Sequence, residues 1–365
     1  MKRIYFTVTN DITYDQRMQR ICNSLAEDGF EVILVGRKRK TSPPLRVEKF
    51  GQHRISCWFN KGKLFYAEYN FRILFFLLFK KMDGICAIDL DSILPCLIIS
   101  KWKSIPRIYD AHELFTELKE VMTRPGIKKI WSRIEKFAVP KFVLGYTVSD
   151  GITAEFKRRY GVNFETIRNV PGLRAFTNPV VAEKFILYQG AVNEGRGLEY
   201  LVPAMKMVEH KLVICGDGNF MDELQKLIHV NGVEKKIELK GMLLPDELWS
   251  ISQQALIGVA LAEKIGLNQW LALPNKFFDY IHSGLPQVTM KYPEYEKINL
   301  RYNVAVLLDE LDPETIAKAI NDLISDKEKY QAMKENCLRA RQELNWEREH
   351  LRLIAFYRSI FPRET

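Results

Sequence analysis

The chain has 365 residues, of which 47% are hydrophobic and 27% are charged, so its composition is that of a globular protein of about two domains and not of a disordered chain. Its formal net charge of +9 indicates anionic partners, such as nucleic acid, an anionic membrane surface or phosphorylated substrates. The six cysteines are scattered without a C-x-x-C motif, which indicates a reducing, cytoplasmic interior and argues against a structural zinc site.

The beginning of the chain predicts a βαβ unit, with a strand at residues 4–9, a helix at 16–28 and a second strand at 30–35. The N-terminus has no long apolar core followed by small residues, so we expect no signal peptide. The loop after the first strand contains no glycine, which argues against a dinucleotide fingerprint at this position. Further strands of the first half are predicted at 84–88, 107–109 and 144–148, and residues 174–180 are interpreted as a linker.

Two nearby stretches combine basic and apolar residues. Residues 37–40 are a basic run within the loop-rich segment 36–63, and residues 64–79 are rich in aromatic and aliphatic side chains and are followed by Lys80 and Lys81. The apolar run is shorter than the roughly 20 residues that span a bilayer. A helix at 64–81 would be apolar nearly all round, so it is either fully buried or makes a peripheral contact with an anionic membrane.

Ionisable side chains follow two predicted strands of the first half. Asp110, His112 and Glu113 come directly after one of them, where open α/β sheets place groups that handle ligands. We therefore favour a functional role for these three side chains over helix capping, with the two acidic residues either orienting His112 or meeting a hydroxyl group of a ligand. Asp89 and Asp91 follow the other strand and could hold a divalent metal, although helix capping by Asp91 or Ser92 is a sufficient explanation.

The second half predicts a strand at 185–188, a glycine-rich loop at 189–197 and a second glycine turn after a strand at 211–215. Glycines let backbone amides approach an anion closely, and Arg196 at the start of the following helix can clamp it. The residues of these two turns are Gly190, Gly195, Gly197, Gly216, Asp217 and Gly218. Later elements are predicted at 237–240, 304–308, 313–326, 328–342 and 346–361, with a loop at 263–268.

Residues 273–289 predict one short helix that begins at Pro274 and Asn275 and leads into a strand. Lys276 and Asp279 share its polar face at the N-terminus, where free backbone N–H groups and the helix dipole attract an anion. A phosphate at the helix start with a carboxylate one turn on fits a nucleoside diphosphate and its ribose. The alternative is a surface ion pair of Lys276 and Asp279 on a helix capped by Asn275.

The run Pro-Asn-Lys-Phe-Phe-Asp-Tyr at 274–280, followed after three residues by Gly-Leu-Pro, resembles the donor-site signature of family 4 retaining glycosyltransferases with the GT-B fold. More narrowly, it is similar to the bacterial surface-polysaccharide branch. The resemblance implies an α/β protein with two Rossmann-like domains that face each other across a cleft. Residues 1–175 would bind the acceptor, residues 176–345 would bind a nucleotide sugar, and a helix at 346–365 would cross back to the first domain.

The resemblance also implies roles for individual residues. Arg196 and Lys276 would stabilise the departing nucleoside diphosphate, and His112 would face the reacting sugar. The family's two donor-holding glutamates align with Leu271 and Asp279, so the first is absent, and Glu263 is a candidate replacement. The other donor-binding residues would be Gly190, Gly195, Gly197, Gly216, Asp217, Gly218, Met242, Leu243, Pro274 and Asn275, with Asp279 on the ribose. The acceptor-binding residues would be Asn10, Asp11, Arg17, Asp110 and Glu113.

The implied function is a retaining glycosyltransferase of the hexosyltransferase type. Its acceptor is expected to be a saccharide or lipid-linked saccharide in polysaccharide or capsule biosynthesis. We expect no metal or other cofactor, because protein cations would neutralise the leaving group, and no nucleic acid partner, because no nucleic-acid module is present in the sequence. The expected location is the cytoplasm, with peripheral contact to the inner face of the cytoplasmic membrane. A GT-B sugar-nucleotide epimerase and a non-catalytic nucleotide-sugar-binding protein stay open as alternatives.

Overall fold

The computed structural model describes residues 1–13, 15–177, 179 and 184–363, and the predicted linker at 174–180 lies partly outside them. The chain divides into two compact units. The first unit comprises residues 1–168 and 349–365, and the second comprises residues 169–348. Because the C-terminal segment belongs to the first unit, the chain passes from one unit to the other at two places.

The described part of the first unit contains a seven-stranded sheet with the strand order β3-β2-β1-β4-β5-β6-β7. Every strand pairing recorded in it is parallel. The order reverses between β1 and β4, and in open α/β sheets ligands bind at the carboxyl ends of the strands at such a reversal. The strands are β1 Arg3–Thr7, β2 Glu31–Lys38, β3 Gly51–Ser56, β4 Gly84–Ile88, β5 Arg107–Ala111, β6 Leu144–Thr147 and β7 Glu165–Thr166.

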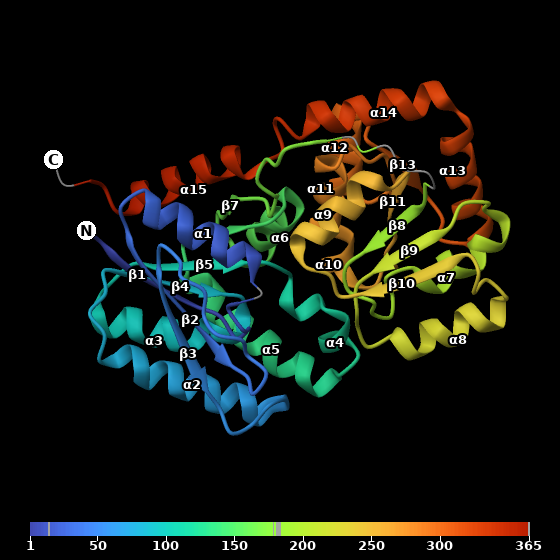
Figure 1. Ribbon diagram of the computed structural model, residues 1–365. Helices are drawn as coiled ribbons and strands as arrows, with labels where there is room; N and C mark the ends of the chain where they lie inside the picture. Colours follow the sequence, from blue (N-terminus) through green and yellow to red (C-terminus); the bar gives the residue numbers. More distant parts are fainter. Residues whose placement is uncertain (14, 178, 180–183, 364–365) are drawn as a thin grey trace. The chain divides into compact units, whose positions relative to one another are not determined.

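Helices cover both faces of this sheet, with α1 and α15 on one side and α2 and α3 on the other (Figure 1). Helix α1 buries an apolar stripe of Met18, Ile21, Cys22 and Leu25 and turns its polar side outward. The helices of the unit are α1 Gln16–Glu27, α2 Gly62–Leu78, α3 Ile93–Lys103, α4 Lys119–Met122, α5 Pro125–Ala138, α6 Asp150–Tyr160 and α15 Trp346–Ile360, which begins in the last three residues of the second unit, with short 3-10 helices at Leu90–Ser92, Phe115–Glu117 and Val139–Lys141.

The second unit has a six-stranded parallel sheet among its described residues, in the order β10-β9-β8-β11-β12-β13, which reverses between β8 and β11. The strands are β8 Ile186–Gln189, β9 Leu212–Cys215, β10 Ile237–Gly241, β11 Ile257–Ala260, β12 Gln287–Met290 and β13 Ala305–Leu308. The helices are α7 Leu198–Ala204, α8 Met221–Asn231, α9 Pro245–Gln254, α10 Gly266–Leu271, α11 Asn275–His282, α12 Pro293–Tyr302, α13 Pro313–Ser325 and α14 Lys327–Ala340, with a 3-10 helix at Met205–Met207.

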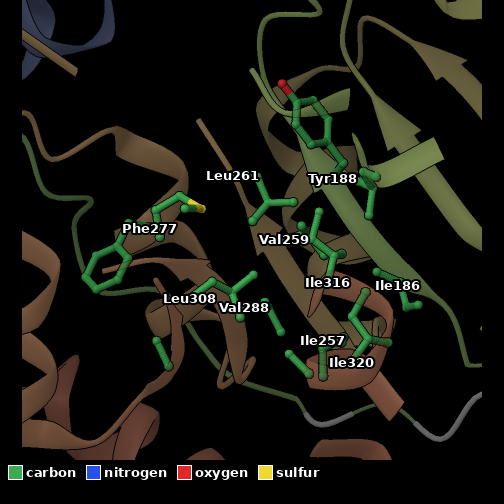
Figure 2. Close-up of a cluster of buried hydrophobic side chains, with 14 of the residues drawn as sticks. Ile186, Tyr188, Ile257, Val259, Leu261, Phe277, Val288, Leu308, Ile316 and Ile320 are labelled. Carbon is green, nitrogen blue, oxygen red and sulfur yellow. The ribbon is translucent and has the colours of Figure 1, made fainter. Parts of the chain in front are cut away.

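The core of the second unit lies between this sheet and its helices. Figure 2 shows Ile186, Ile257, Val259 and Val288 from three adjacent strands, which belong to one buried cluster with Phe277 of α11, and all five are fully buried. Parallel strands are covered on both faces, so their sequences are nearly continuous apolar runs. Burial of each large side chain of this kind contributes about 1.5–3 kcal/mol, and the same packing fixes α11 against the ends of the strands.

The structure confirms most of the predicted elements and corrects three interpretations. The segment 36–63 is not only loop, because β3 occupies Gly51–Ser56. The segment 263–268 is a loop only up to residue 265, since α10 begins at Gly266. The alternative of a fully buried helix at 64–81 is wrong, because Phe71 and Phe75 of α2 are 66% and 58% exposed. No helix within the described residues combines the length and the hydropathy that crossing a membrane requires.

Candidate functional site

Two glycine turns at the carboxyl ends of β8 and β9 pack directly on each other. Gly190 has a φ of +111° and Gly216 a φ of +155°. A Cβ atom at Gly216 would overlap the carbonyl oxygen of Gly190, and one at Gly218 would overlap the carbonyl oxygen of Val192. Only glycine permits these approaches. The glycines that the sequence analysis assigned to anion binding therefore also serve the contact between the two turns.

Helix α11 begins at the same edge of the sheet, as predicted, with Pro274 as its N-cap and Asn275 as its first residue. Asn275 does not cap the helix, because its Oδ1 accepts a hydrogen bond from Nδ2 of Asn169 at 2.6 Å. A Cβ atom at Gly190 would lie 3.4 Å from Cε of Lys276. The start of α11 and the first glycine turn are therefore neighbours, and the N–H groups of the helix start lie beside a glycine loop.

The half-buried ammonium of Lys276 lies 3.8 Å from the centroid of the Tyr188 ring. The pKa of Lys276 is lowered to about 7, first by burial and then by repulsion from Arg196. The attraction of Asp279 opposes this shift but does not cancel it. Arg196 comes from the glycine loop, so two cationic side chains influence each other at one place. An anion bound there would favour the charged form of Lys276 and relieve the repulsion between the two cations.

Asp279 lies one turn further along α11 and is oriented by β8. Its Oδ2 accepts a hydrogen bond from Nε2 of Gln189 at 2.9 Å, and Oε1 of Gln189 accepts one from Oγ of Ser252 at 3.0 Å. The hydroxyl of Tyr280, in turn, accepts from the backbone N–H of Gln189 at 3.1 Å. These contacts favour the interpretation of Lys276 and Asp279 as groups of a site over that of a surface ion pair.

The remaining predicted donor residues occupy the same carboxyl edge. Met242 and Leu243 follow β10, where Met242 is 74% exposed and Leu243 packs against a small buried cluster. The end of β10 is joined to the second glycine turn, because the N–H of Gly216 donates to the carbonyl of Gly241 at 2.8 Å. Asp217 is exposed, and its Oδ1 accepts from the N–H of Gly218 at 2.7 Å.

Glu263 lies beside the glycine loop, since its backbone N–H donates to the carbonyl of Gly195 at 3.0 Å. Leu271, where the family's first glutamate would align, is the last residue of α10 and is half-buried. The structure thus brings Glu263 to the loop that carries Arg196. This placement is consistent with the suggestion that Glu263 replaces the absent glutamate.

In the first unit, His112 lies between two carboxylates. Its Nε2 is 3.1 Å from Oδ2 of Asp110, and its Nδ1 is 3.6 Å from Oδ2 of Asp89. Burial opposes protonation, but Asp110 and then Asp89 raise the pKa of His112 to about 9. Only a doubly protonated imidazole can donate from both ring nitrogens. At neutral pH His112 is therefore an imidazolium that can donate hydrogen bonds but cannot accept a proton.

Asp89 has an unusual backbone conformation, with φ +55° and ψ 175°, which is sparsely populated by residues other than glycine. Its Oδ1 accepts the backbone N–H of His112 at 2.8 Å, and its own N–H donates to the carbonyl of Asp110 at 2.9 Å. Burial raises the pKa of Asp89 to about 8, and the nearby Glu113 adds to the rise. Such strain costs about 1–3 kcal/mol and is a feature of functional sites.

The predicted acceptor residues fall into separate groups. Arg17 is 3% exposed and joins the histidine cluster, because its Nη2 donates to Oδ1 of Asp110 at 3.0 Å. Asp11 is paired instead with Arg54 at 3.2 Å and accepts a hydrogen bond from Ser42. Asn10 is exposed at the end of β1, and its carbonyl accepts from the N–H of Arg37 at 2.9 Å. Arg17, Asp110 and His112 are thus brought together, whereas Asp11 and Asn10 lie outside their cluster.

Asp89 and Asp91 have different protein partners in this arrangement, since Asp89 contacts His112 and Asp91 contacts Thr9. Asp91 accepts a hydrogen bond from Thr9, and burial raises its pKa to about 6. Among the residues that the structure describes, no group of three or more His, Cys, Asp or Glu side chains is arranged to hold a metal ion. Asp89, which follows β4, and Asp110 of β5 contact the histidine.

Comparison with known proteins places these observations in a wider context. Residues 172–339, most of the second unit, match the family model described as glycosyl transferases group 1. An uncharacterised glycosyltransferase of Methanocaldococcus jannaschii is 29% identical over 150 residues, which are 40% of this chain and 36% of that protein. The match thus spans little more than a third of the length of this curated relative.

The solved structures that are similar cover nearly the whole chain. Sucrose-phosphate synthase from Thermosynechococcus elongatus superposes with a TM-score of 0.86 at 15% identity, over 99% of each chain. The Anabaena protein HepE, solved in complex with UDP and glucose, superposes with a TM-score of 0.75 at 13% identity, over 98% of this chain and 100% of its own. The protein has the GT-B fold. At these identities the likeness shows the fold alone, and the site must be argued from this chain.

Sequence reasoning missed two contacts of this GT-B protein that the structure makes plain. Gln189 orients Asp279 although 90 residues separate them, and Asp89 orients His112 across 23 residues. The position of Gln189 at the end of a strand was a usable signal. No sequence signal marked the backbone conformation of Asp89, because aspartate follows many strands in ordinary conformations.

Proposed function

We propose that the protein is a glycosyltransferase that moves a sugar from a nucleotide-sugar donor to an acceptor hydroxyl. The observation that carries the proposal is the meeting of Lys276, Arg196, a glycine loop and the N-terminus of α11 at one edge of the second sheet. Each of these features favours an anion, and a nucleoside diphosphate is the anion that this fold would receive there. The group 1 match over residues 172–339 supports the same conclusion.

In this mechanism the second unit binds the donor and the first unit handles the acceptor. Breaking the bond between the sugar and the diphosphate builds negative charge on the leaving oxygen. Lys276, Arg196 and the backbone N–H groups are aimed at that charge before the reaction begins, which lowers the barrier. Asp279, oriented by Gln189, would hold the ribose hydroxyls, and Met242 and Leu243 would border the base.

His112 would act as a hydrogen-bond donor to an oxygen of the reacting sugar, since a protonated imidazole is no general base. Its Nε2–H faces Asp110 at 3.1 Å, so the donating group would be Nδ1–H, which lies 3.6 Å from Asp89, longer than an ordinary hydrogen bond. Arg17 does not touch substrate in this scheme but keeps Asp110 ionised, because its guanidinium lies 3.0 Å away and, against the effect of burial, lowers the pKa of that carboxyl. Retention of configuration, membership of family 4 and transfer of a hexose rest on the resemblance of residues 274–286 to the family signature.

The acceptor is proposed to be a saccharide, lipid-linked, in the synthesis of a surface polysaccharide or capsule. The Pro-Asn-Lys form of the signature supports this branch, and the exposed aromatic face of α2 suits a protein that works at the inner face of the cytoplasmic membrane. No metal is proposed, because Lys276 and Arg196 supply the positive charge at the leaving group.

A non-catalytic nucleotide-sugar-binding protein is the second candidate, and the leucine at position 271 favours it. A protein that only binds the donor needs the diphosphate and ribose contacts but not a complete grip on the sugar. The position of Glu263 beside Gly195 weighs against this candidate. Turnover of a nucleotide sugar in the presence of a saccharide acceptor decides between the two.

Calorimetric titration with UDP, GDP and other nucleoside diphosphates in EDTA tests the donor site. We expect one diphosphate to bind without metal, with UDP the first to try, and Asp279→Ala to weaken that binding. Binding that requires magnesium would return Asp89 and Asp91 to consideration as metal ligands. If no diphosphate binds under either condition, the donor site is wrongly assigned.

The affinity for the diphosphate should depend on pH through Lys276. With a pKa of about 7, Lys276 is mostly neutral in the free protein at pH 8, and a bound diphosphate favours the protonated form. Affinity should therefore fall as the pH rises above 7, by up to about tenfold per pH unit, with uptake of a proton on binding. Calorimetry in two buffers of different ionisation enthalpy measures that proton. Lys276→Met should abolish the uptake that the wild type shows, and an unchanged proton count would contradict the assignment.

A further inference from the structure

The outer side of α2 carries a row of aromatic rings that the fold leaves uncovered. Phe71, Phe75 and Phe79 recur at every fourth residue and are 66%, 58% and 72% exposed. Their rings contact one another in sequence, with centroids 6.3 Å and 5.4 Å apart. The opposite side of the helix, with Phe65, Tyr69, Ile73 and Leu77, is buried against the unit. The fold therefore uses one stripe of this helix for its core and leaves a second apolar stripe in water.

The neighbouring helix α3 extends this surface. Helices α2 and α3 lie side by side (Figure 1), and Nζ of Lys103 donates to the carbonyl of Leu78 at 3.0 Å, which joins their C-terminal ends. Ile98 and Trp102 on α3 are 52% and 64% exposed. We call the surface formed by Phe71, Phe75, Phe79, Ile98 and Trp102 the α2–α3 face. Exposed aromatic residues gathered in this way mark an interaction site.

The α2–α3 face is bordered by lysines, and Glu68, the acidic residue of α2, is neutralised by an ion pair with Arg72 at 2.7 Å. Neither residues 69–82 nor residues 92–109 contain an Asp or Glu, whereas Lys80, Lys81, Lys101 and Lys103 fall within them. A surface pocket of about 400 Å³ lies at the C-terminal ends of the two helices, and its lining includes Phe79, Trp102 and three of these lysines. Such a pocket offers positive charge to an anionic group and aromatic surface to an apolar one.

We propose that the α2–α3 face binds an anionic phospholipid bilayer, with the aromatic row entering the interface and the lysine-lined pocket receiving a lipid phosphate. Amphipathic surfaces of this composition lie in the plane of the headgroups, and each lysine near an anionic surface adds to the attraction. A second copy of the same face is a poorer occupant, because it would place the lysines of two chains opposite each other. This inference gives a defined surface to the peripheral membrane contact in the proposed function, and it rests on that part of the proposal.

Co-sedimentation with vesicles tests the inference. Wild-type protein should bind vesicles of phosphatidylcholine with phosphatidylglycerol, bind those of phosphatidylcholine alone weakly, and lose the difference at high salt. Lys80→Ala with Lys81→Ala should lower partitioning about thirtyfold, since each lysine near the surface contributes about fivefold. Phe71→Ser with Phe75→Ser and Phe79→Ser should lower it further. The matched control is Lys226→Ala with Lys235→Ala, which removes the same charge from exposed positions of the second unit and should leave partitioning unchanged.

Trp102 reports whether the face enters the bilayer. Brominated lipids should quench part of the wild-type tryptophan fluorescence, and Trp102→Phe should remove that part. Binding to neither vesicle, or equal losses in the control and the patch variants, would overturn the proposal. Self-association that the phenylalanine substitutions break would assign the face to a second copy instead. Titration of each variant with UDP measures the affinity of the donor site independently of vesicle binding. If the membrane proposal is wrong but the donor site is right, UDP binds and the vesicles do not; if the donor site is wrong, UDP does not bind.

Discussion

Lys276→Ala and Arg196→Ala are each expected to lower turnover by about 10²–10³-fold, because each removes one pre-aimed group from the developing charge of the leaving diphosphate. The two side chains act at one place, as the effect of Arg196 on the pKa of Lys276 shows. The double variant should therefore lose less than the product of the two single losses. Initial rates of nucleoside diphosphate release measure all three.

The control for this series is Lys226→Ala, which removes an exposed lysine from α8 in the same unit. It should keep the wild-type rate. Thermal unfolding of each variant should be close to that of the wild type, because Lys276 is only half-buried and lies at a helix start. Near-normal turnover in both single variants would show that the diphosphate binds elsewhere.

His112→Ala is expected to lower the rate by about two orders of magnitude while sparing the affinity for the diphosphate, because His112 belongs to the other unit. The charge of His112 gives a sharper test. The rate should be measured at saturating donor, where bound diphosphate keeps Lys276 protonated. If the imidazolium is the active form, turnover under that condition should persist up to about pH 9 and fall above it, since the pKa of His112 is raised to about 9.

Asp89→Asn should move that decline to lower pH, because it removes one of the two carboxylates that keep His112 protonated. Asparagine can still accept the backbone N–H of His112 and has the same shape as the aspartate that already occupies this backbone conformation, so the exchange adds no strain. The fold should therefore survive the exchange. If the pH–rate profile of Asp89→Asn is the same as that of the wild type, Asp89 has a structural role only. If His112→Ala loses diphosphate affinity as well as activity, the same holds for His112.

The alternation of strands and helices could be predicted from the sequence, because buried parallel strands are nearly continuous apolar runs. The strands and helices of the second unit could be predicted in the same way. Strand β3 was missed since Gly51–Ser56 contains one isoleucine among polar residues, as a strand at the edge of a sheet can. The position of Lys276 at a helix start was predicted from Pro274 and Asn275. Its contact with the Tyr188 ring was not, because that contact joins residues 88 positions apart in a fold whose register the sequence does not display.

The acceptor half was harder to predict. The sequence marked Asp110, His112 and Glu113 as a group but offered two explanations for the Asp-Leu-Asp stretch at 89–91, a metal site or a helix cap by Asp91 or Ser92. Neither explanation foresaw the contact of Asp89 with His112. What decides its role is a backbone conformation imposed by the packing of β4 and β5. Conformations of that kind depend on the whole unit and leave no pattern in the neighbouring residues.

Helix α15 has a consequence for how the chain is made. Tyr357 packs on Phe6 and Phe30, Arg358 binds Asp28 at 2.6 Å, and the Phe361 ring lies against Gly84. All of these partners leave the ribosome before the second unit is synthesised, and the helix that covers them leaves after it. Synthesis of the first unit thus begins before that of the second unit and ends after it. During translation the apolar face of the sheet that α15 covers stays exposed for the time needed to make about 180 residues. The second unit, continuous in sequence, can fold while the first one waits.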